Sequence, residues 1–226
     1  MKKLILYFIL GLILTGCGLM WIVLPKPDLT PYKKVGVITF TLENAKGPIN
    51  TLVTQYFVEE VAKSYPGVQF LELGELSNVL KVAYQHNAEF APNVWCGVGP
   101  GYLLNEKSRQ TTINGEDAQI IGQYFGIPAI FVGLVTASDF RLWSEAYAIP
   151  GLTADVRLTI WVQLWSTETG RILWEKSTWA MKRFGRGGLP MIESHDNKPY
   201  FLHQNPEEGY GCFLRPMTRK LTRDFR

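Results

Sequence analysis

Two cysteines in the body of the chain could form a disulfide bond. Cys96 and Cys212 lie far apart in the sequence, and both fall in segments without a regular apolar pattern. If the domain is exported to an oxidising compartment, they are the one pair of thiols that can join within it. The bond would close a loop of about 100 residues or more, for which chain entropy predicts up to about 4–5 kcal/mol of stabilisation if the bond is unstrained.

Other side chains that often carry chemistry do not form a site in the sequence. His195, Asp196 and His203 could in principle bind a metal, but the surrounding polar loop offers no preset geometry. Glu59 and Glu60 are adjacent on a predicted helix, so they do not face each other and are expected on its solvated side. No serine-hydrolase elbow, zinc-protease motif or kinase signature is present. We therefore expect no catalytic residues, no metal and no cofactor.

The third cysteine ends an N-terminal segment that has the order of an export signal. Lys2 and Lys3 precede an apolar run from residue 4 to 14, and small residues follow it. The tetrapeptide Leu14-Thr15-Gly16-Cys17 resembles a bacterial lipobox, which implies cleavage before Cys17 and lipid attachment (palmitate) to it. Because Gly18 rather than Asp comes next, the resemblance also implies sorting to the periplasmic face of the outer membrane.

A second interpretation of this segment remains open. The apolar run continues beyond Cys17 to Leu24, and the whole run from Leu4 is long enough to span a bilayer, which takes about 20 residues. Residues 4–24 would then be an uncleaved inner-membrane signal anchor, with Lys2 and Lys3 in the cytoplasm. Both interpretations place the rest of the chain outside the cytoplasm.

The apolar pattern predicts an α/β (α+β) domain with a small mixed sheet and packed helices. Strand patterns cover 35–40, 68–73 and 128–136, helical patterns cover 48–64, 76–84 and 116–125, and residues 85–114 form a long irregular loop. Strands 153–165 and 171–180 read as a hairpin. We divide the chain into a signal peptide (1–16), a tether (17–33), the envelope domain (34–184) and an irregular tail with a C-terminal helix (185–226).

Aromatic residues gather on the predicted hairpin. Alternation along its first strand places Trp161 and Trp165 on the face opposite an aliphatic stripe, and Trp174 joins them if the hairpin register allows it. Either helices cover both faces of the sheet and these side chains are core, or the face meets a neighbouring subunit, a glycan or the membrane headgroups. Trp161, Trp165 and Trp174 are therefore candidate interface residues.

Four segments of the sequence resemble segments of a known group of proteins. They are the strand Lys34–Phe40, the helix-to-strand segment Asp117–Ala129, the strand Val132–Val135 and the hairpin turn Leu164–Trp174. Together they resemble the envelope lipoproteins related to the curli secretion channel, including the Pel lipoprotein and the activators of penicillin-binding proteins, and the amino-terminal domain of TolB. The resemblance implies a lipid-anchored α/β domain that takes part in periplasmic assemblies, often as rings.

The net charge of the chain limits the classes of partner that are expected. The net charge is +3, and removing the two lysines of a leader leaves +1, so no electrostatic attraction to nucleic acid is expected. We expect a non-enzymatic lipoprotein that is an accessory or assembly component of a secretion, polysaccharide-export or peptidoglycan machine. Its partners would be the membrane, through the lipid, and either copies of itself or another envelope protein. The alternative is an anchored module that binds a glycan or peptide.

Overall fold

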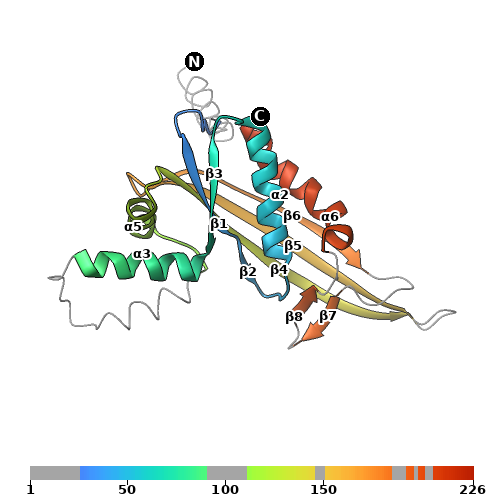
Figure 1. The fold of residues 1–226 in the computed structure, drawn as a ribbon. Helices are drawn as coiled ribbons and strands as arrows, with labels where there is room; N and C mark the ends of the chain where they lie inside the picture. The colour runs from blue at the N-terminus through green and yellow to red at the C-terminus, as the bar shows by residue number, and fades with distance from the viewer. Residues whose placement is uncertain (1–25, 91–110, 146–150, 185–191, 196–197, 202–205) are drawn as a thin grey trace, which may run out of the picture.

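The computed structural model describes residues 26–90, 111–145, 151–184, 192–195, 198–201 and 206–226 (Figure 1). They form a mixed α/β fold, which confirms the predicted class. The elements are β1 (Lys34–Thr39), β2 (Thr41–Glu43), α2 (Ile49–Ser64), β3 (Gln69–Glu75), α3 (Leu76–Phe90), α5 (Gly115–Phe125), β4 (Ala129–Glu145), β5 (Gly151–Ser166), β6 (Ile172–Phe184), β7 (Ile192–His195), β8 (Lys198–Phe201), α6 (Pro206–Leu221) and the 3₁₀ helix η2 (Thr222–Phe225).

Six strands form one sheet in the order β3-β1-β4-β5-β6, with β2 beside the later part of β4. β1 is parallel to both β3 and β4, whereas β5 is antiparallel to β4 and β6. β7 and β8 form a separate hairpin. The long strands β4 to β6 extend well beyond β1 and β3 (Figure 1). Within the described residues, β6 is therefore one edge of the sheet, and β3 and the short strand β2 form the other.

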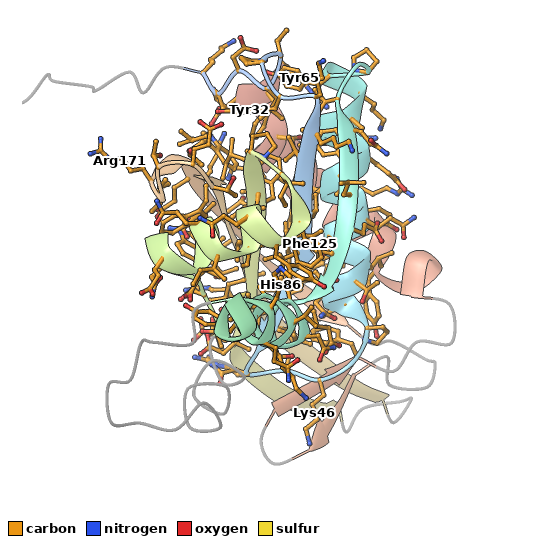
Figure 2. The ribbon with its side chains drawn as sticks, turned by 60° about the vertical axis from the view of Figure 1, so that its left-hand side comes forward. Tyr32, Lys46, Tyr65, His86, Phe125 and Arg171 are labelled. Atoms are coloured by element: carbon orange, nitrogen blue, oxygen red, sulfur yellow. The ribbon has the colours of Figure 1, made fainter. Side chains whose placement is uncertain are left out.

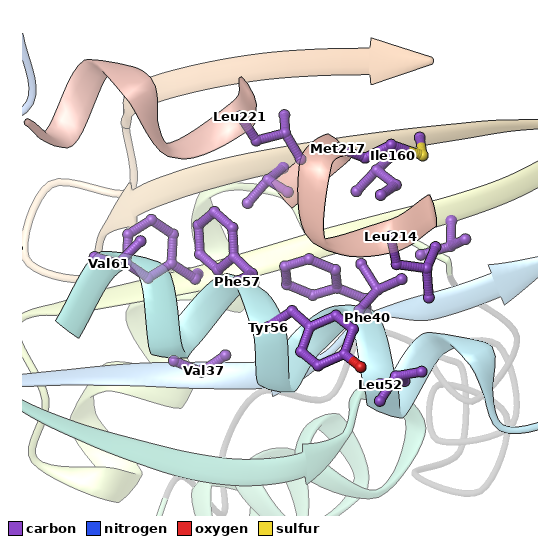
Figure 3. Close-up of a cluster of buried hydrophobic side chains, with 14 of the residues drawn as sticks. Val37, Phe40, Leu52, Tyr56, Phe57, Val61, Ile160, Leu214, Met217 and Leu221 are labelled. Atoms are coloured by element: carbon purple, nitrogen blue, oxygen red, sulfur yellow. The ribbon is translucent and has the colours of Figure 1, made fainter. Parts of the chain in front are cut away.

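One face of the sheet packs against α2 and α6, and this layer contains the larger hydrophobic cluster (Figure 3). Alternate residues of β5 point into it, as the aliphatic stripe predicts: Val156, Leu158, Ile160, Val162 and Leu164. Tyr56, Phe57 and Val61 enter from α2 at helical spacing, and Leu214, Met217 and Leu221 enter from α6. The core therefore joins segments from both ends of the described chain.

The C-terminal segment is part of this domain. Phe225 is buried, and its ring lies 4.7 Å from Trp174, 5.7 Å from Phe131 and 6.5 Å from Phe57. Asp224 accepts hydrogen bonds from Trp174 Nε1 and from Lys176 Nζ on β6. The division at residue 184 is thus not a boundary of the core, because the last helix covers the sheet beside α2.

A charge cluster holds the end of the chain against α2. Glu60 is buried, contrary to the predicted solvated face, and its carboxylate lies 2.6 Å from Lys63 Nζ and 2.7 Å from Arg226 Nη2, with Arg219 Nε at 3.6 Å. Burial acts to raise the pKa of Glu60, but the hydrogen bonds from Lys63 and Arg226 and the nearby charge of Arg219 outweigh it, so the pKa lies below its ordinary value.

We expect Glu60→Gln to destabilise the domain by about 1–3 kcal/mol at pH 7, because the variant loses the buried carboxylate that pairs these cations. A lowered folded-state pKa stabilises the fold above the unfolded-state pKa of about 4.3, and this contribution is lost as pH falls through the folded value. The difference between wild type and variant in urea unfolding should therefore shrink below about pH 4. Glu59→Gln is the control, since Glu59 is half-exposed beside Arg215. If the difference in unfolding free energy between wild type and Glu60→Gln did not change with pH, this explanation would be wrong.

Among the described elements, α3 and α5 cover part of the other face of the sheet. In Figure 2 these helices lie in front of the sheet, with His86 and Phe125 where they meet. Between them, Tyr84 Oη donates to Asp117 Oδ1 at 2.6 Å. Burial and this carboxylate raise the pKa of Tyr84 far above its ordinary value, so the phenol stays a donor. Beneath them, a second hydrophobic cluster includes Ile130 and Trp165.

Candidate protein-interaction surface

The hairpin of β5 and β6 determines where the predicted tryptophans lie. Trp161 and Trp165 share the face that α3 and α5 partly cover, as strand alternation predicts. A register shift next to Leu164 puts one extra residue on β6, and Trp174 therefore pairs with Leu164 on the opposite face. The structure thus separates Trp174 from the other two.

Two of the three candidates are core residues. Trp165 is 8% exposed in the cluster beneath α3 and α5, and its Nε1 donates to Gln163 Oε1 at 3.0 Å. Trp174 is 6% exposed in the cluster beneath α2 and α6. Each side chain is buried and its indole N–H has a hydrogen-bond partner within the domain, so neither residue belongs to an interface. Trp161 remains, half-buried, with its Nε1 donating to Glu175 Oε1 at 2.9 Å.

Among the residues whose side chains are described, the most exposed aromatic one was not predicted from the sequence. Trp179 on β6 is 59% exposed, and Met181 two residues later is 52% exposed on the same face. Trp161 and Leu134 are half-buried neighbours on β5 and β4. We call these four residues the aromatic patch. It lies on the part of the face beyond the reach of the hydrophobic cluster that α3 and α5 form.

Polar side chains hold the patch in place. The guanidinium of Arg157 lies over the Trp179 ring, 4.9 Å from its centroid, and also pairs with Asp139 at 3.2 Å. The carboxylate of Glu175 accepts from both Trp161 Nε1 and Gln163 Nε2. The side chains around the exposed indole are thus fixed before any partner arrives, which lowers the entropic cost of binding.

The turn of the hairpin is clamped against α5. A Cβ on Gly122 would lie 2.1 Å from Thr167 Cβ, and one on Gly115 would lie 2.5 Å from Gly170 O, so only glycine allows this approach. Thr167 Oγ1 donates to Ile127 O. Two segments that carried the family resemblance, one containing the Gly126 helix cap and one containing the turn, therefore lie against each other.

A hollow of about 360 Å³ lies beside this contact. Its wall includes Gln119, Gln123, Pro128 and Glu168, and Glu168 is the one ionisable residue in it. These lining residues include no nucleophile with an adjacent base, so no catalytic role is assigned to the hollow.

The cysteine and histidine candidates lie mostly outside the described residues. Cys17, Cys96 and His203 fall there, so the structure gives no contacts for the lipid site, the proposed disulfide or that metal ligand. Cys212 lies on α6 rather than in an irregular segment, with an exposed free thiol. His195 lies in the short strand β7. In the part of the chain with described positions, no three His, Cys, Asp or Glu residues gather as a metal site.

Both interpretations of the anchor concern residues 1–25, which also lie outside the described part. Of the helices that the structure does describe, none combines the length and the apolar character needed to cross a bilayer.

Comparison with known proteins finds similar solved structures but no relative by sequence. No family model and no curated protein matches the sequence. Solved structures similar to the chain include the C-terminal domain of LpoB from Salmonella enterica (14% identity, 66% of this chain and 83% of that one, TM-score 0.35). They also include the PelC dodecamer from Paraburkholderia phytofirmans (9%, 88% and 91%, 0.40) and lipoprotein GNA1162 from Neisseria meningitidis (12%, 66% and 83%, 0.31).

These neighbours belong to the envelope lipoprotein group that the sequence segments resemble. At 9–14% identity and TM-scores of 0.31–0.40, the likeness concerns the course of the chain. Evidence for the function therefore comes from this chain's own residues.

Proposed function

We propose that this chain is a non-enzymatic lipoprotein of the cell envelope that acts as a self-associating assembly component. The lipobox at Cys17 supports an anchor at the periplasmic face of the outer membrane, with a signal anchor at 4–24 in the inner membrane as the alternative. The machine it serves would be one for secretion, polysaccharide export or peptidoglycan synthesis.

The observation that carries this proposal is the exposure of Trp179 at the edge of the sheet. Trp179, with 59% of its surface exposed, and Met181, at 52%, form a large apolar area that the described residues leave uncovered. Aromatic side chains at the centre of an interface contribute much of its binding energy. Among the described strands, β6 has a partner strand on one side only, and such an edge can add another strand.

Trp179→Ala should weaken association of the full chain by about 2 kcal/mol or more, while its unfolding midpoint stays close to that of wild type. Sedimentation of the detergent-solubilised protein across a concentration range measures the association. Tyr124→Ala, which removes a 39% exposed ring on α5 outside the patch, is the control and should leave association unchanged. Equal association of wild type and Trp179→Ala would remove the patch from the interface.

A glycan-binding module is the second candidate, and one observation favours it. Thr159 lies opposite Trp179 on β5 and Ser177 lies two residues before it on the same face, so hydroxyl groups flank the exposed indole. An aromatic ring with adjacent hydroxyls can stack against a sugar and hydrogen-bond its edges. A wild-type monomer whose tryptophan fluorescence saturates on titration with peptidoglycan fragments would favour this function over self-association.

A further inference from the structure

The two edges of the sheet differ in how well they are protected. β3 has seven residues, a register shift against β1, Glu72 and Glu75, and Gly74 at φ +94°. Short length, a bulge and charges are the devices that keep an edge strand from pairing. β6 has 13 residues, and after the shift next to Leu164 its pairing is regular from Trp174 to Phe184. Among the described strands, β6 is therefore the long edge that is open to another strand, since β2 at the other edge has only three residues.

We infer that β6 pairs antiparallel with β6 of a second copy, centred on Trp179, and joins the two sheets across a two-fold axis. This inference rests on the proposed function and specifies its interface. A two-fold axis perpendicular to the sheet keeps each side chain on its own face, so residues whose numbers add to 358 lie opposite each other. Trp179 then meets Trp179 of the second copy, within reach of an aromatic cross-strand contact.

The charges on β6 are arranged symmetrically about this centre. Glu175 lies four residues before Trp179 and Arg183 lies four residues after it, on the same face. The pairing therefore sets Glu175 of each copy opposite Arg183 of the other, giving two ion pairs, and sets Ser177 opposite Met181. Opposite charges directly across a strand pair are favourable, whereas like charges are not.

Both charged side chains are exposed to solvent. Glu175 is exposed, and its hydrogen bonds to Trp161 and Gln163 fix its position. Arg183 binds Asp155 through Nε and Nη2, and 63% of its side chain is exposed. A shift of the centre to Ser177 would place Glu175 opposite Trp179 and remove both ion pairs, so the charges favour one register.

The opposite face imposes two unfavourable pairs of like charge, and the structure weakens both. The same register sets Lys176 of each copy opposite Lys182 of the other. Lys176 Nζ already lies 2.7 Å from Asp224 Oδ1 within its own chain, which neutralises its charge. The remaining pairs on that face are Thr178 with Ala180, which are small, and Trp174 with Phe184 at the ends of the paired segment.

Disulfide cross-linking in membranes that carry the full chain tests the register. In a background with Cys96→Ser and Cys212→Ser, Trp179→Cys should give a cross-linked dimer at least tenfold more abundant than Thr159→Cys, which lies one strand inward on the same face. Glu175→Cys and Arg183→Cys, produced together, should cross-link with Trp179 still in place. Glu175→Cys alone should not, because its two copies lie eight positions apart.

The outcomes separate this inference from the proposed function. A wild-type chain that associates while neither Trp179→Cys nor the mixed pair cross-links would overturn the inference and leave self-association standing. Cross-linking of Glu175→Cys alone would overturn the register. A wild-type chain that stays monomeric at all concentrations would reject both. The background protein with Cys96→Ser and Cys212→Ser and no added cysteine shows that the cross-links come from the new thiols. The thermal unfolding of each variant shows that the chains are folded.

Discussion

Replacing Cys17 with Ala should abolish fatty-acid labelling of the chain. The lipid of a bacterial lipoprotein is attached through the cysteine sulfur, and alanine has no atom that can take its place. The interpretation rests on Leu14-Thr15-Gly16-Cys17 after a basic start and an apolar run. Cells grown with a clickable fatty acid should show a labelled band for wild type and none for the variant, with Cys212→Ser labelled as wild type.

The labelling experiment also separates the two interpretations of the anchor. If residues 4–24 form a transmembrane helix, wild type and Cys17→Ala should both stay in the membrane fraction without label, because the apolar run is unchanged. That result would show that residues 4–24 are a signal anchor and that Cys17 carries no lipid. The domain would still lie outside the cytoplasm.

The largest effect on stability is expected for Phe57→Ala, at about 3–5 kcal/mol. Phe57 is fully buried, and its ring centroid lies 5.1 Å from that of Phe131, 5.4 Å from that of Phe40 and 6.5 Å from that of Phe225. Removing it leaves a cavity where α2, the sheet and the C-terminal 3₁₀ helix meet, and these three elements cannot all move in to fill it.

Urea unfolding measures this loss, with Val58→Ala as the control on the same helix. Val58 is only partly buried against the cluster, so its truncation should cost far less. A loss of under about 1 kcal/mol for Phe57→Ala would contradict the packing of α2 and the C-terminal segment on one face of the sheet.

Local patterns were sufficient to predict most of the elements that carry the patch. Alternation along β5 placed its aliphatic residues on one face and Trp161 on the other, because side chains of a strand alternate whatever surrounds it. Gly126 marked the end of α5, where it adopts φ 64°. The apolar spacing of α2 predicted its buried side. These features depend on neighbours within a few residues.

Long-range features could not be predicted in the same way. The face of Trp174 depends on one extra residue in β6 opposite Leu164, which the sequence does not reveal. The exposure of Trp179 follows from β6 being an edge strand beyond the helical cover, a property of the whole topology. Glu60 is buried because Arg219 and Arg226, more than about 150 residues away, fold back onto it.

Native mass spectrometry of the full chain, extracted from membranes in detergent, tests the central claim most directly. It reads the mass of each subunit and the number of subunits together. The account predicts a dimer or a larger even-numbered assembly whose subunits begin at Cys17 and carry acyl groups. A monomer at every concentration, with subunits that retain residues 1–16 and carry no lipid, would contradict it.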